Sequence, residues 1–536
     1  MNGNTGASRG PRGAGALAVV AAVAVLTACG GGHSSSVGSA SAESAAYRAN
    51  LAFAHCMQSH GLPGFPDPNP SGTFSFGRGL TGNSNSPAAR AYDACKYLLP
   101  RGSATTAATP SPPGAVPGDC LASHPPCYAP RQFRVAYGIQ PLLDRGIDGR
   151  GVTVVLPEEA ETGPEQPPAV TGPGLPPAVT DIRQDVAGFD SRFGLPPARI
   201  QVRTMLAGPD ASTWLAGVEE VADTEMVHAV APDATIVELL VDPADVSTPA
   251  KFAATWATAV RIAARNGEVI SQSGIGQDFN LGEYSFTSAE VATINSALEY
   301  AAARHVTVVV ASGDNGAIGN GATTPVREVS LPASDPLVLA AGGTSLTANP
   351  VTGAYIRETA WNTLLGLPSA GDSAGSGGGF SHLFARPAYQ DGVPGIGATR
   401  GVPDVAGDAS GLTGMAFAFS APGGGSQLIG LGGTSAAAPF WAGLIALADQ
   451  EAGRPLGFVN PAIYRIARGP LYHKAFHDIT TGNNTVVLNG VTVSGYQAGP
   501  GWDPVTGWGT PDAQVLIPLL ARLSTAKWSS GPKRKH

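Results

Sequence analysis

The chain has 536 residues, of which 71 are Gly, 46 are Pro and only 13% are charged, and its formal net charge is −8. This balance excludes a protein that binds nucleic acid through a basic surface, because phosphate binding needs an excess of Lys and Arg. The length suffices for one large domain and a small additional module. The high Gly and Pro content favours a loop-rich extracellular protein over a cytosolic one.

The first 28 residues have the pattern of a bacterial lipoprotein signal peptide. Arg9 and Arg12 precede an apolar run from Ala14 to Ala28, and the run ends in Leu-Thr-Ala-Cys. This ending resembles a lipobox, in which cleavage before Cys29 exposes a thiol for lipidation. A lipid on Cys29 would hold the protein at the outer face of the cell membrane. The alternative is an ordinary signal peptide and a secreted protein.

Residues 29–44 are rich in Gly and Ser and predict a flexible tether. Residues 45–100 then form a small module, with helices expected at Tyr47–His60 and Ala88–Leu99. Residues 101–118 predict a linker because they consist largely of Pro, Ala, Thr and Ser.

Four further cysteines indicate disulfides in an exported protein: Cys56, Cys95, Cys120 and Cys127. They can pair in three ways. The simplest pairing is Cys56–Cys95 with Cys120–Cys127, because each pair then brackets one local unit. The spacings are not those of a zinc knuckle.

The region 119–525 alternates apolar runs with helical stretches. Buried strands are expected at 152–156, 234–241, 306–311 and 337–341, and helices at 251–265 and 288–304. Strands that alternate with helices predict an α/β fold with a mostly parallel central sheet and helices on both faces. A Pro-rich surface loop is expected at 164–177, and the basic residues of 526–536 predict a solvated tail.

The stretch Gly-Gly-Thr-Ser-Ala-Ala-Ala-Pro at 432–439 is typical of a serine nucleophile at the start of a helix. The glycines permit a tight turn, and Pro439 suits the first turn of a helix. Ser435 would lie beside backbone amide donors and at the positive end of the helix dipole. The structural alternative is a tightly packed Gly/Ala-rich turn.

A serine needs a base to take its proton. No His lies in a sequence context that suggests a subtilisin-type base, but Glu219 and Asp223 are four residues apart and share one face of a predicted helix. Two carboxylates this close repel each other, so one keeps its proton to higher pH. Such a pair can act as a general base in acid, where His would be protonated. The alternative, a solvated acidic helix face, fits the apolar neighbours of these residues less well.

Asp314 follows the β-branched strand Val308–Val310 within a Gly-Asp-Asn-Gly turn. Asp at this position is most often a turn former. A protonated Asp314 could instead donate a hydrogen bond to a developing oxyanion, and this role again requires acid.

Five motifs in this order resemble the sedolisin family of serine-carboxyl peptidases. They are Glu219, Asp223 and Glu225 ahead of Ala231-Pro232-Asp233-Ala234, then Ser312-Gly313-Asp314, Gly377–Ser381, Arg400–Asp404, and Gly433-Thr434-Ser435 with Pro439. The resemblance covers Asp119 to Leu520 and implies a subtilisin-like fold. Motifs that agree in order as well as in content are far more specific than any one of them.

The resemblance also implies a role for each residue. Ser435 would attack the peptide carbonyl, Glu219 would shuttle the proton, Asp223 would orient Glu219, and Asp314 would stabilise the oxyanion together with the amide of Ser435. The implied substrates are proteins or peptides, cleaved by a monomeric endopeptidase in acid. Release of tripeptides, or a surface lipoprotein with a catalytically silent peptidase fold, are the alternatives.

A structural calcium ion is a further implication of the resemblance. Its ligands would be the carboxylates of Asp478 and Asp503 and the carbonyls of Ile479, Gly499 and Gly501, the oxygen ligands that calcium prefers. Two turn-forming segments are the structural alternative.

The chain departs from the family pattern in three places. Ser271–Gly276 lacks the aromatic residue that many members carry after the second serine, and the first strand ends in Glu158 and Glu159, where some members place an additional acid. The stretch between Cys29 and the catalytic region does not resemble the family's prodomain. We expect that the Cys56–Cys95 module replaces the prodomain or that the enzyme folds without one.

Overall fold

The computed structural model describes residues 45–60, 95, 128–160, 181–205, 217–273, 275, 281–319, 324–363, 373–420 and 426–523. An eight-stranded sheet forms the centre of the catalytic region, with the strand order β10-β6-β5-β4-β1-β3-β2 and with β7 paired to β6. All neighbours on this path are parallel, and only β7 runs antiparallel. The strands are β1 Thr153–Glu159, β2 Arg199–Thr204, β3 Thr235–Val241, β4 Val269–Gln272, β5 Thr307–Ala311, β6 Leu339–Ala348, β7 Tyr355–Ala360 and β10 Val405–Asp408.

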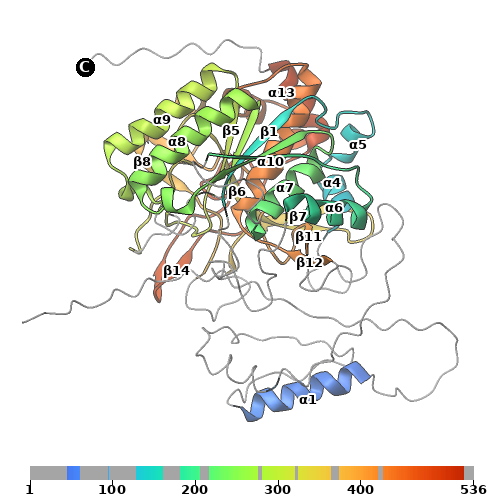
Figure 1. The fold of residues 1–536 in the computed structure, drawn as a ribbon. Coiled ribbons are helices and arrows are strands. Elements are labelled where there is room, and N and C mark those ends of the chain that lie inside the picture. Colours follow the sequence, from blue (N-terminus) through green and yellow to red (C-terminus); the bar gives the residue numbers. More distant parts are fainter. Residues whose placement is uncertain are drawn as a thin grey trace, which may run out of the picture.

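Helices cover both faces of the sheet (Figure 1). One face carries α8 (Pro249–Asn266) and α9 (Ser288–Ala303), and the other carries α7 (Val218–Val230) and α10 (Thr434–Ala452). Successive residues of a strand therefore enter different cores: Val155 packs on the α8 side and Leu156 on the α7 side. This arrangement confirms the predicted fold class.

The helices α7 and α10 pack closely against each other. A Cβ atom on Gly443 of α10 would lie 2.7 Å from Cβ of Val230 on α7, so only glycine fits at this crossing. The close approach fixes the two helices that carry Glu219, Asp223 and Ser435 relative to one another.

Shorter elements surround this centre. The helices are α1 Ala45–Ser59, α4 Pro130–Ala136, α5 Gln140–Leu143, α6 Ile182–Phe193, α11 Asn460–Ala467, α12 Tyr472–Ala475 and α13 Ala513–Leu523, with 3-10 turns η3 Pro243–Asp245, η4 Glu283–Ser285 and η6 Ala388–Gln390. The remaining strands are β8 Gly379–Ala385, β9 Thr399–Val402, β11 Ala416–Ser420, β12 Ser426–Gly430, β13 Phe476–His477, β14 Val486–Leu488, β15 Val491–Val493 and β16 Thr510–Pro511.

Two expectations need correction. Pro439 is the sixth residue of α10 rather than part of its first turn, because the helix already begins at Thr434. Having no N–H, Pro439 cannot donate the helical hydrogen bond to the carbonyl of Ser435. The strand expected at 337–341 extends to Ala348, because its polar second half pairs with β7 and β10.

In the N-terminal module the disulfide Cys56–Cys95 is present, and α1 carries Cys56 as expected. The lipobox, Cys120, Cys127, the Pro-rich loop, the basic tail and all of the second predicted helix except Cys95 lie outside the described residues. Among the described residues no helix is long and apolar enough to cross a membrane.

Candidate active site

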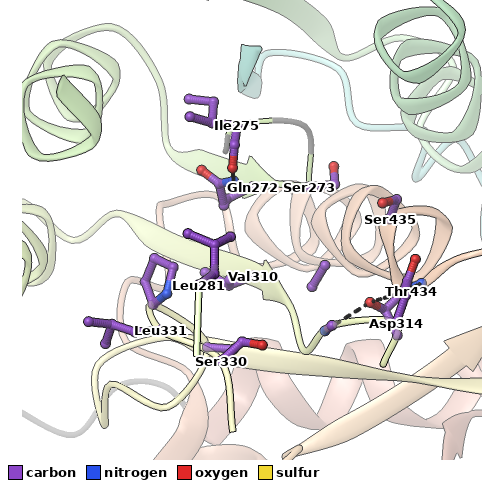
Figure 2. A pocket seen from close by; sticks show the side chains of 14 residues that line it. Gln272, Ser273, Ile275, Leu281, Val310, Asp314, Ser330, Leu331, Thr434 and Ser435 are labelled. Atoms are coloured by element: carbon purple, nitrogen blue, oxygen red, sulfur yellow. Dashed lines mark hydrogen bonds between the residues drawn. The ribbon is translucent and has the colours of Figure 1, made fainter. Parts of the chain in front are cut away.

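Ser435 is the second residue of α10 and lies half-buried in a pocket that Asp314 and Ser273 also line (Figure 2). The helix begins here because Gly433, its N-cap, adopts φ +136°, a conformation that side chains rarely allow. At the start of a helix the amide groups are not used by helical hydrogen bonds. The serine hydroxyl therefore lies beside potential anion-binding donors.

Asp314 is fixed by the residue that precedes the serine. Oδ1 of Asp314 accepts hydrogen bonds from the backbone amide of Thr434 at 2.7 Å and from its hydroxyl at 2.8 Å (Figure 2). The Thr434 hydroxyl in turn accepts from the amide of Gly313 at 3.0 Å. Burial raises the pKa of Asp314, and the two hydrogen bonds from Thr434 oppose this rise.

The other oxygen of Asp314 faces Gly433. A Cβ atom on Gly433 would lie 2.7 Å from Oδ2 of Asp314. Glycine is thus required here twice, for its backbone conformation and for the space beside the carboxyl group.

Helix α7 is buried along its whole length except at Glu219, which is partly exposed. The alternative of a solvated acidic helix face is therefore wrong. Glu219 lies in the first turn, where the helix dipole favours a carboxylate, and Asp223 lies one turn later. Only Glu219 of this helix reaches the surface, so it is the side chain that can exchange protons with a bound substrate.

Asp223 is almost fully buried and lies among other polar groups. The hydroxyl of Ser273 donates a hydrogen bond to its Oδ2, and the acid Glu158 lies nearby. Burial raises the pKa of Asp223 well above its ordinary value, and the negative charge of Glu219 raises it further. Acids that lie this close together and this deeply buried favour protonated forms over several like charges.

The sequence analysis assigned no role to two buried acids near this site, Glu158 and Glu238. Glu158, at the end of β1, is fully buried, and burial raises its pKa well above the ordinary range. Glu238 is buried in the middle of β3, between Val237 and Leu239. For Glu238 the available signal was a single carboxyl residue within an otherwise apolar strand, because such a residue needs a special environment.

The structure therefore brings the predicted residues together in two connected groups. Ser435 and Asp314 line one pocket, and Ser273, which lines the same pocket, links it to Asp223 by a hydrogen bond. Glu219 lies one helical turn from Asp223 on α7.

The rest of the pocket is largely apolar. Asp314 is the only ionisable residue among the described residues that line it. The lining consists of Gln272, Ser273, Ile275, Leu281, Val310, Ala311, Gly313, Asp314, Ser330, Leu331, Pro332, Ala333, Thr434 and Ser435. Such a lining suits an uncharged side chain, since a charged one would lose its hydration without gaining a partner.

The predicted calcium ligands lie in two neighbouring loops. Both oxygens of Asp478 accept from the amide of Gly501 at 3.1 Å, and Oδ2 of Asp503 accepts from the amide of Gly499 at 3.2 Å. Burial raises the pKa of Asp503 to about 6. In the part of the chain that the structure describes, no Lys or Arg pairs with either carboxylate. Two carboxylates that converge on one loop without a basic partner fit a divalent cation.

The comparisons with known proteins agree with this geometry. The model of the subtilase family matches residues 204–462. The solved structure of Pseudomonas sedolisin, described as a serine-carboxyl proteinase in complex with two molecules of pseudo-iodotyrostatin, is similar with a TM-score of 0.58 and 26% identity, over 74% of this chain and 99% of that chain. Kumamolisin from Bacillus sp. (strain MN-32) is 37% identical over 328 residues, which are 60% of this chain and 52% of kumamolisin.

The chain is thus similar to members of the sedolisin family. Sedolisin from Pseudomonas sp. (strain 101) is 38% identical over 222 residues, or 40% of this chain and 35% of that protein. Human tripeptidyl-peptidase 1 is 33% identical over 265 residues, or 44% of this chain and 41% of that protein. The chain thus spans about half the length, or less, of the curated relatives it matches.

Proposed function

We propose that this chain is a serine-type endopeptidase of the sedolisin family that hydrolyses peptide bonds at acidic pH. The observation that carries the proposal is the position of Asp314. Its carboxyl group lies in the pocket of Ser435, and Thr434 bonds it through Oδ1 only. A protonated Asp314 would then carry its proton on Oδ2, on the side of Gly433, where it can donate to an oxyanion.

The reaction follows from these positions. The hydroxyl oxygen of Ser435 attacks the peptide carbonyl while its proton passes to the ionised carboxylate of Glu219. The carbonyl oxygen becomes an oxyanion, which the proton of Asp314 and the amide of Ser435 stabilise. Glu219 then returns the proton to the leaving amine, and an acyl-enzyme remains. Water repeats the sequence and releases the acid product, so no proton is gained or lost by the enzyme.

The preference for acid has two physical sources. Asp314 must be protonated to donate a hydrogen bond, and burial raises its pKa so that the proton is retained to higher pH than in water. Burial also raises the pKa of Asp223, so this acid too keeps its proton to higher pH than in water. Both protons are lost as the pH rises, so we expect kcat/KM to fall toward alkaline pH.

The pocket beside Ser435 supports a preference for an uncharged residue on the acyl side of the cleaved bond. Its walls are formed by Ile275, Leu281, Val310 and Leu331, with Gln272 and Ser330 as polar groups. Peptides that carry Leu, Lys or Glu on the acyl side of the cleaved bond and are otherwise identical test this preference. We expect the highest kcat/KM for the peptide with Leu.

The decisive experiment uses protein that lacks residues 1–29, with denatured protein as substrate, at about pH 4 and at neutral pH. Acid-favoured cleavage that disappears in Ser435→Ala supports the proposal. A folded protein that cleaves nothing at either pH contradicts it and favours a catalytically silent binding protein or an uncleaved zymogen. The loss of an aromatic residue after Ser273 is the sequence feature that gives this alternative its weight.

Endopeptidase and tripeptidyl-peptidase activity are distinguished by the N-terminus of the substrate. The tripeptidyl-peptidase 1 relatives carry the second activity in their name. Peptides with a blocked N-terminus are cleaved by an endopeptidase, whereas release of tripeptides from free N-termini alone identifies an exopeptidase.

The calcium ion, the lipid anchor and the monomeric state belong to the same proposal. A calcium ion held by Asp478 and Asp503 would neutralise two carboxylates near the C-terminus and stabilise the loops that carry them. A lipid on Cys29 would place the enzyme on the outer surface of the cell, with proteins or peptides as substrates. Mass spectrometry of the mature N-terminus tests the anchor.

A further inference from the structure

Three arginines surround one tyrosine on the outer side of α8 and α9. The two helices lie side by side on one face of the sheet (Figure 1). Tyr300 of α9 is half-buried. The Cζ atoms of Arg261, Arg265 and Arg304 lie 5.6, 5.8 and 5.6 Å from the centre of its ring. A guanidinium within about 6 Å of an aromatic ring is attracted to its π electrons. The ring therefore holds together three positive charges that would otherwise repel one another.

The register of the two helices creates this cluster. Arg261 and Arg265 are one turn apart on α8. Ser296, Tyr300 and Arg304 follow one another at the same spacing on α9 and at its end. Nη2 of Arg261 donates to the hydroxyl of Ser296 at 2.9 Å, and Nε of Arg265 donates to the hydroxyl of Tyr300 at 3.1 Å. Both contacts join residues that are 35 positions apart, so the helices run in the same direction and in step.

Two of the arginines are anchored through Nε and keep their outer N–H groups available. Nε of Arg265 bonds Tyr300, and Nε of Arg304 donates to the carbonyl of Ala264 at 2.8 Å. Among the residues that the structure describes, no acceptor bonds the Nη groups of these two arginines. The paired N–H groups of a guanidinium match two oxygens of a phosphate. Because the side chains are already anchored, they lose little further freedom when a ligand binds.

No carboxylate neutralises these charges. In the described part of the chain, no ion pair involves Arg261, Arg265 or Arg304, whereas five other arginines pair with aspartates. Glu299 precedes Tyr300 in the sequence, but consecutive helical side chains point about 100° apart. The chain as a whole has a formal net charge of −8, so three uncompensated positive charges at one place are a local feature.

The positive charges act on the hydroxyl end of the tyrosine. The hydrogen bond from Arg265 lowers the pKa of the Tyr300 phenol, and burial opposes this change. The charges of Arg265, Arg304 and Arg261 lower the pKa as well. An anion at this end of the ring would therefore meet the three charges together, and the phenol O–H could also donate to it.

Stabilisation of the helix ends accounts for only part of the cluster. Basic residues near a helix C-terminus commonly bond the last carbonyls and offset the helix dipole. Arg304 does this for α8, through one N–H to Ala264. Arg261 lies more than one turn before the end of α8 and bonds a side chain of the other helix instead.

We propose that Tyr300 and the three arginines around it form a binding site for one phosphate group, supplied by free phosphate or by the headgroup of an anionic phospholipid. The Nη groups of the arginines would bind the phosphate oxygens, and the hydroxyl of Tyr300 would donate one more hydrogen bond. Phosphate fits better than a carboxylate, because it offers more oxygens and up to two negative charges to three cations. The site does not depend on the proposed peptidase activity.

This site lies at the opposite edge of the sheet from the pocket of Ser435. Helix α8 leads directly into β4, and Arg304 lies three residues before β5 begins at Thr307. The cluster is therefore close to the amino ends of these strands, whereas Asp314 of the pocket follows the carboxyl end of β5. A phosphate bound here leaves the pocket open. A membrane bound here would have the pocket on the side that faces away from it.

Calorimetric titration with inorganic phosphate near neutral pH tests the site. The protein lacks residues 1–29, so that no lipid contributes. We expect saturable binding that is weakened at least about tenfold in Arg265→Gln and in Arg304→Gln, because each loses charged donors. Tyr300→Phe keeps the ring and loses only the O–H, so its affinity should fall by about threefold. Equal phosphate binding by the wild type and these variants would overturn the proposal.

Arg327 provides a matched control. It is exposed, and its Cζ lies 4.9 Å from the centre of the Tyr496 ring. Its Nε and Nη2 donate to the carbonyls of Ser494 and Gly495 at 2.6 and 3.4 Å, and no second arginine among the described residues lies over this ring. Arg327→Gln removes the same charge from the protein and should bind phosphate as the wild type does. An equal loss of affinity in Arg327→Gln and Arg265→Gln would show that net charge alone matters, and would overturn the proposal.

Vesicles distinguish the two sources of phosphate. Sedimentation compares vesicles that contain phosphatidylglycerol with vesicles of phosphatidylcholine alone, at low salt because salt screens exposed charges. Binding to the anionic vesicles only, lost in Arg265→Gln and kept in Arg327→Gln, identifies the headgroup as the ligand. Saturable phosphate binding without vesicle binding identifies free phosphate. If neither phosphate nor anionic vesicles bind, or if only vesicles bind and Arg265→Gln binds them equally well, the proposal fails.

Discussion

Thr434 and Asp314 are joined by two hydrogen bonds that end on the same carboxylate oxygen. The amide of Thr434 donates to Oδ1 at 2.7 Å, and its hydroxyl donates to the same atom at 2.8 Å. Thr434 thereby holds this one oxygen of Asp314 as an acceptor. Since the next residue is Ser435, adjacent positions of one helix hold the proposed nucleophile and the proposed oxyanion donor.

Replacing this hydroxyl should change both the rate and the pH dependence. Thr434→Val removes one of the two bonds to Oδ1 and leaves the amide of Gly313 without its acceptor. We expect kcat to fall about tenfold, because a net hydrogen bond of this kind contributes about 1.5 kcal/mol. The lost bond had opposed the rise in the pKa of Asp314, so the alkaline limb of the kcat/KM profile should move to higher pH.

Thr434→Ser, which keeps the hydroxyl, should resemble the wild type in a kcat/KM profile. A Thr434→Val profile with an unmoved limb would contradict the assignment of Asp314.

The glycine at the start of α10 should tolerate no side chain. In Gly433→Ala the new Cβ would lie 2.7 Å from Oδ2 of Asp314, at φ +136°. We expect a loss of activity of at least about 100-fold, because the side chain of Asp314, the proposed oxyanion donor, is displaced.

Gly453, at the other end of the same helix, also has a positive φ of +65° but no atom within 4 Å of an added Cβ. Gly453→Ala should therefore cost about 1 kcal/mol of stability and leave kcat unchanged. Equal loss of activity in both variants would show that backbone strain, and not the contact with Asp314, is responsible.

The stability of the fold should decrease between about pH 4.5 and pH 8. Burial raises the pKa of Glu238 and Asp408 to about 8, and it raises the pKa of Glu158 and Asp223 well above their ordinary values. A group whose pKa is raised in the folded state stabilises it below the unfolded pKa and loses that contribution as the pH rises toward the folded value.

His477 acts in the opposite direction, because burial lowers its pKa to about 4. His477 is a single group, whereas several buried acids lose their stabilising contribution as the pH rises. We therefore expect the midpoint temperature of unfolding to be lower at pH 8 than at pH 4.5. A calorimetric scan at the two pH values decides this. A higher midpoint at pH 8 would show that these acids are charged in the folded protein.

Calcium should raise the unfolding temperature through Asp503 and Asp478. Removal of the ion with a chelator should lower the midpoint, and excess calcium should restore it, since a ligand of the folded state stabilises by mass action. In Asp478→Asn and Asp503→Asn the calcium-dependent increment should shrink or vanish. The comparison must include each variant without calcium, because Asp503 also accepts bonds from the amides of Val505 and Thr506. A chelator effect that survives both substitutions would place the ion elsewhere.

The sequence could predict the fold because the strands are apolar runs of the right length. The stretches around Val154, Ile236 and Val309 have few polar residues, as strands buried on both faces require. Motif order pointed to Ser435, Asp314, Glu219 and Asp223, and the structure brings Asp314 and Ser435 to one pocket. Their chemical roles stay predictions.

The connections between those residues could not be predicted. That Ser273 bonds Asp223, and that Thr434 bonds Asp314, depends on how a loop after β4 and a turn after β5 meet two helices from distant parts of the chain. Glu238 was missed for a related reason: its partners, Thr224 and Glu158, become its neighbours only when β1, β3 and α7 are assembled. The register of parallel strands, which sets such neighbours, leaves no local mark in the sequence.

The complete burial of α7 apart from Glu219 has a consequence for the environment in which the protein works. Dissolved ions screen charges that face water, but they do not enter a closed interior. The interactions among Asp223, Glu158 and Glu238 are therefore shielded from changes in salinity. Protons, in contrast, can reach the partly exposed carboxyl group of Glu219. A change in the salt concentration of the surroundings would leave these interactions unaffected, whereas acidification would act on them.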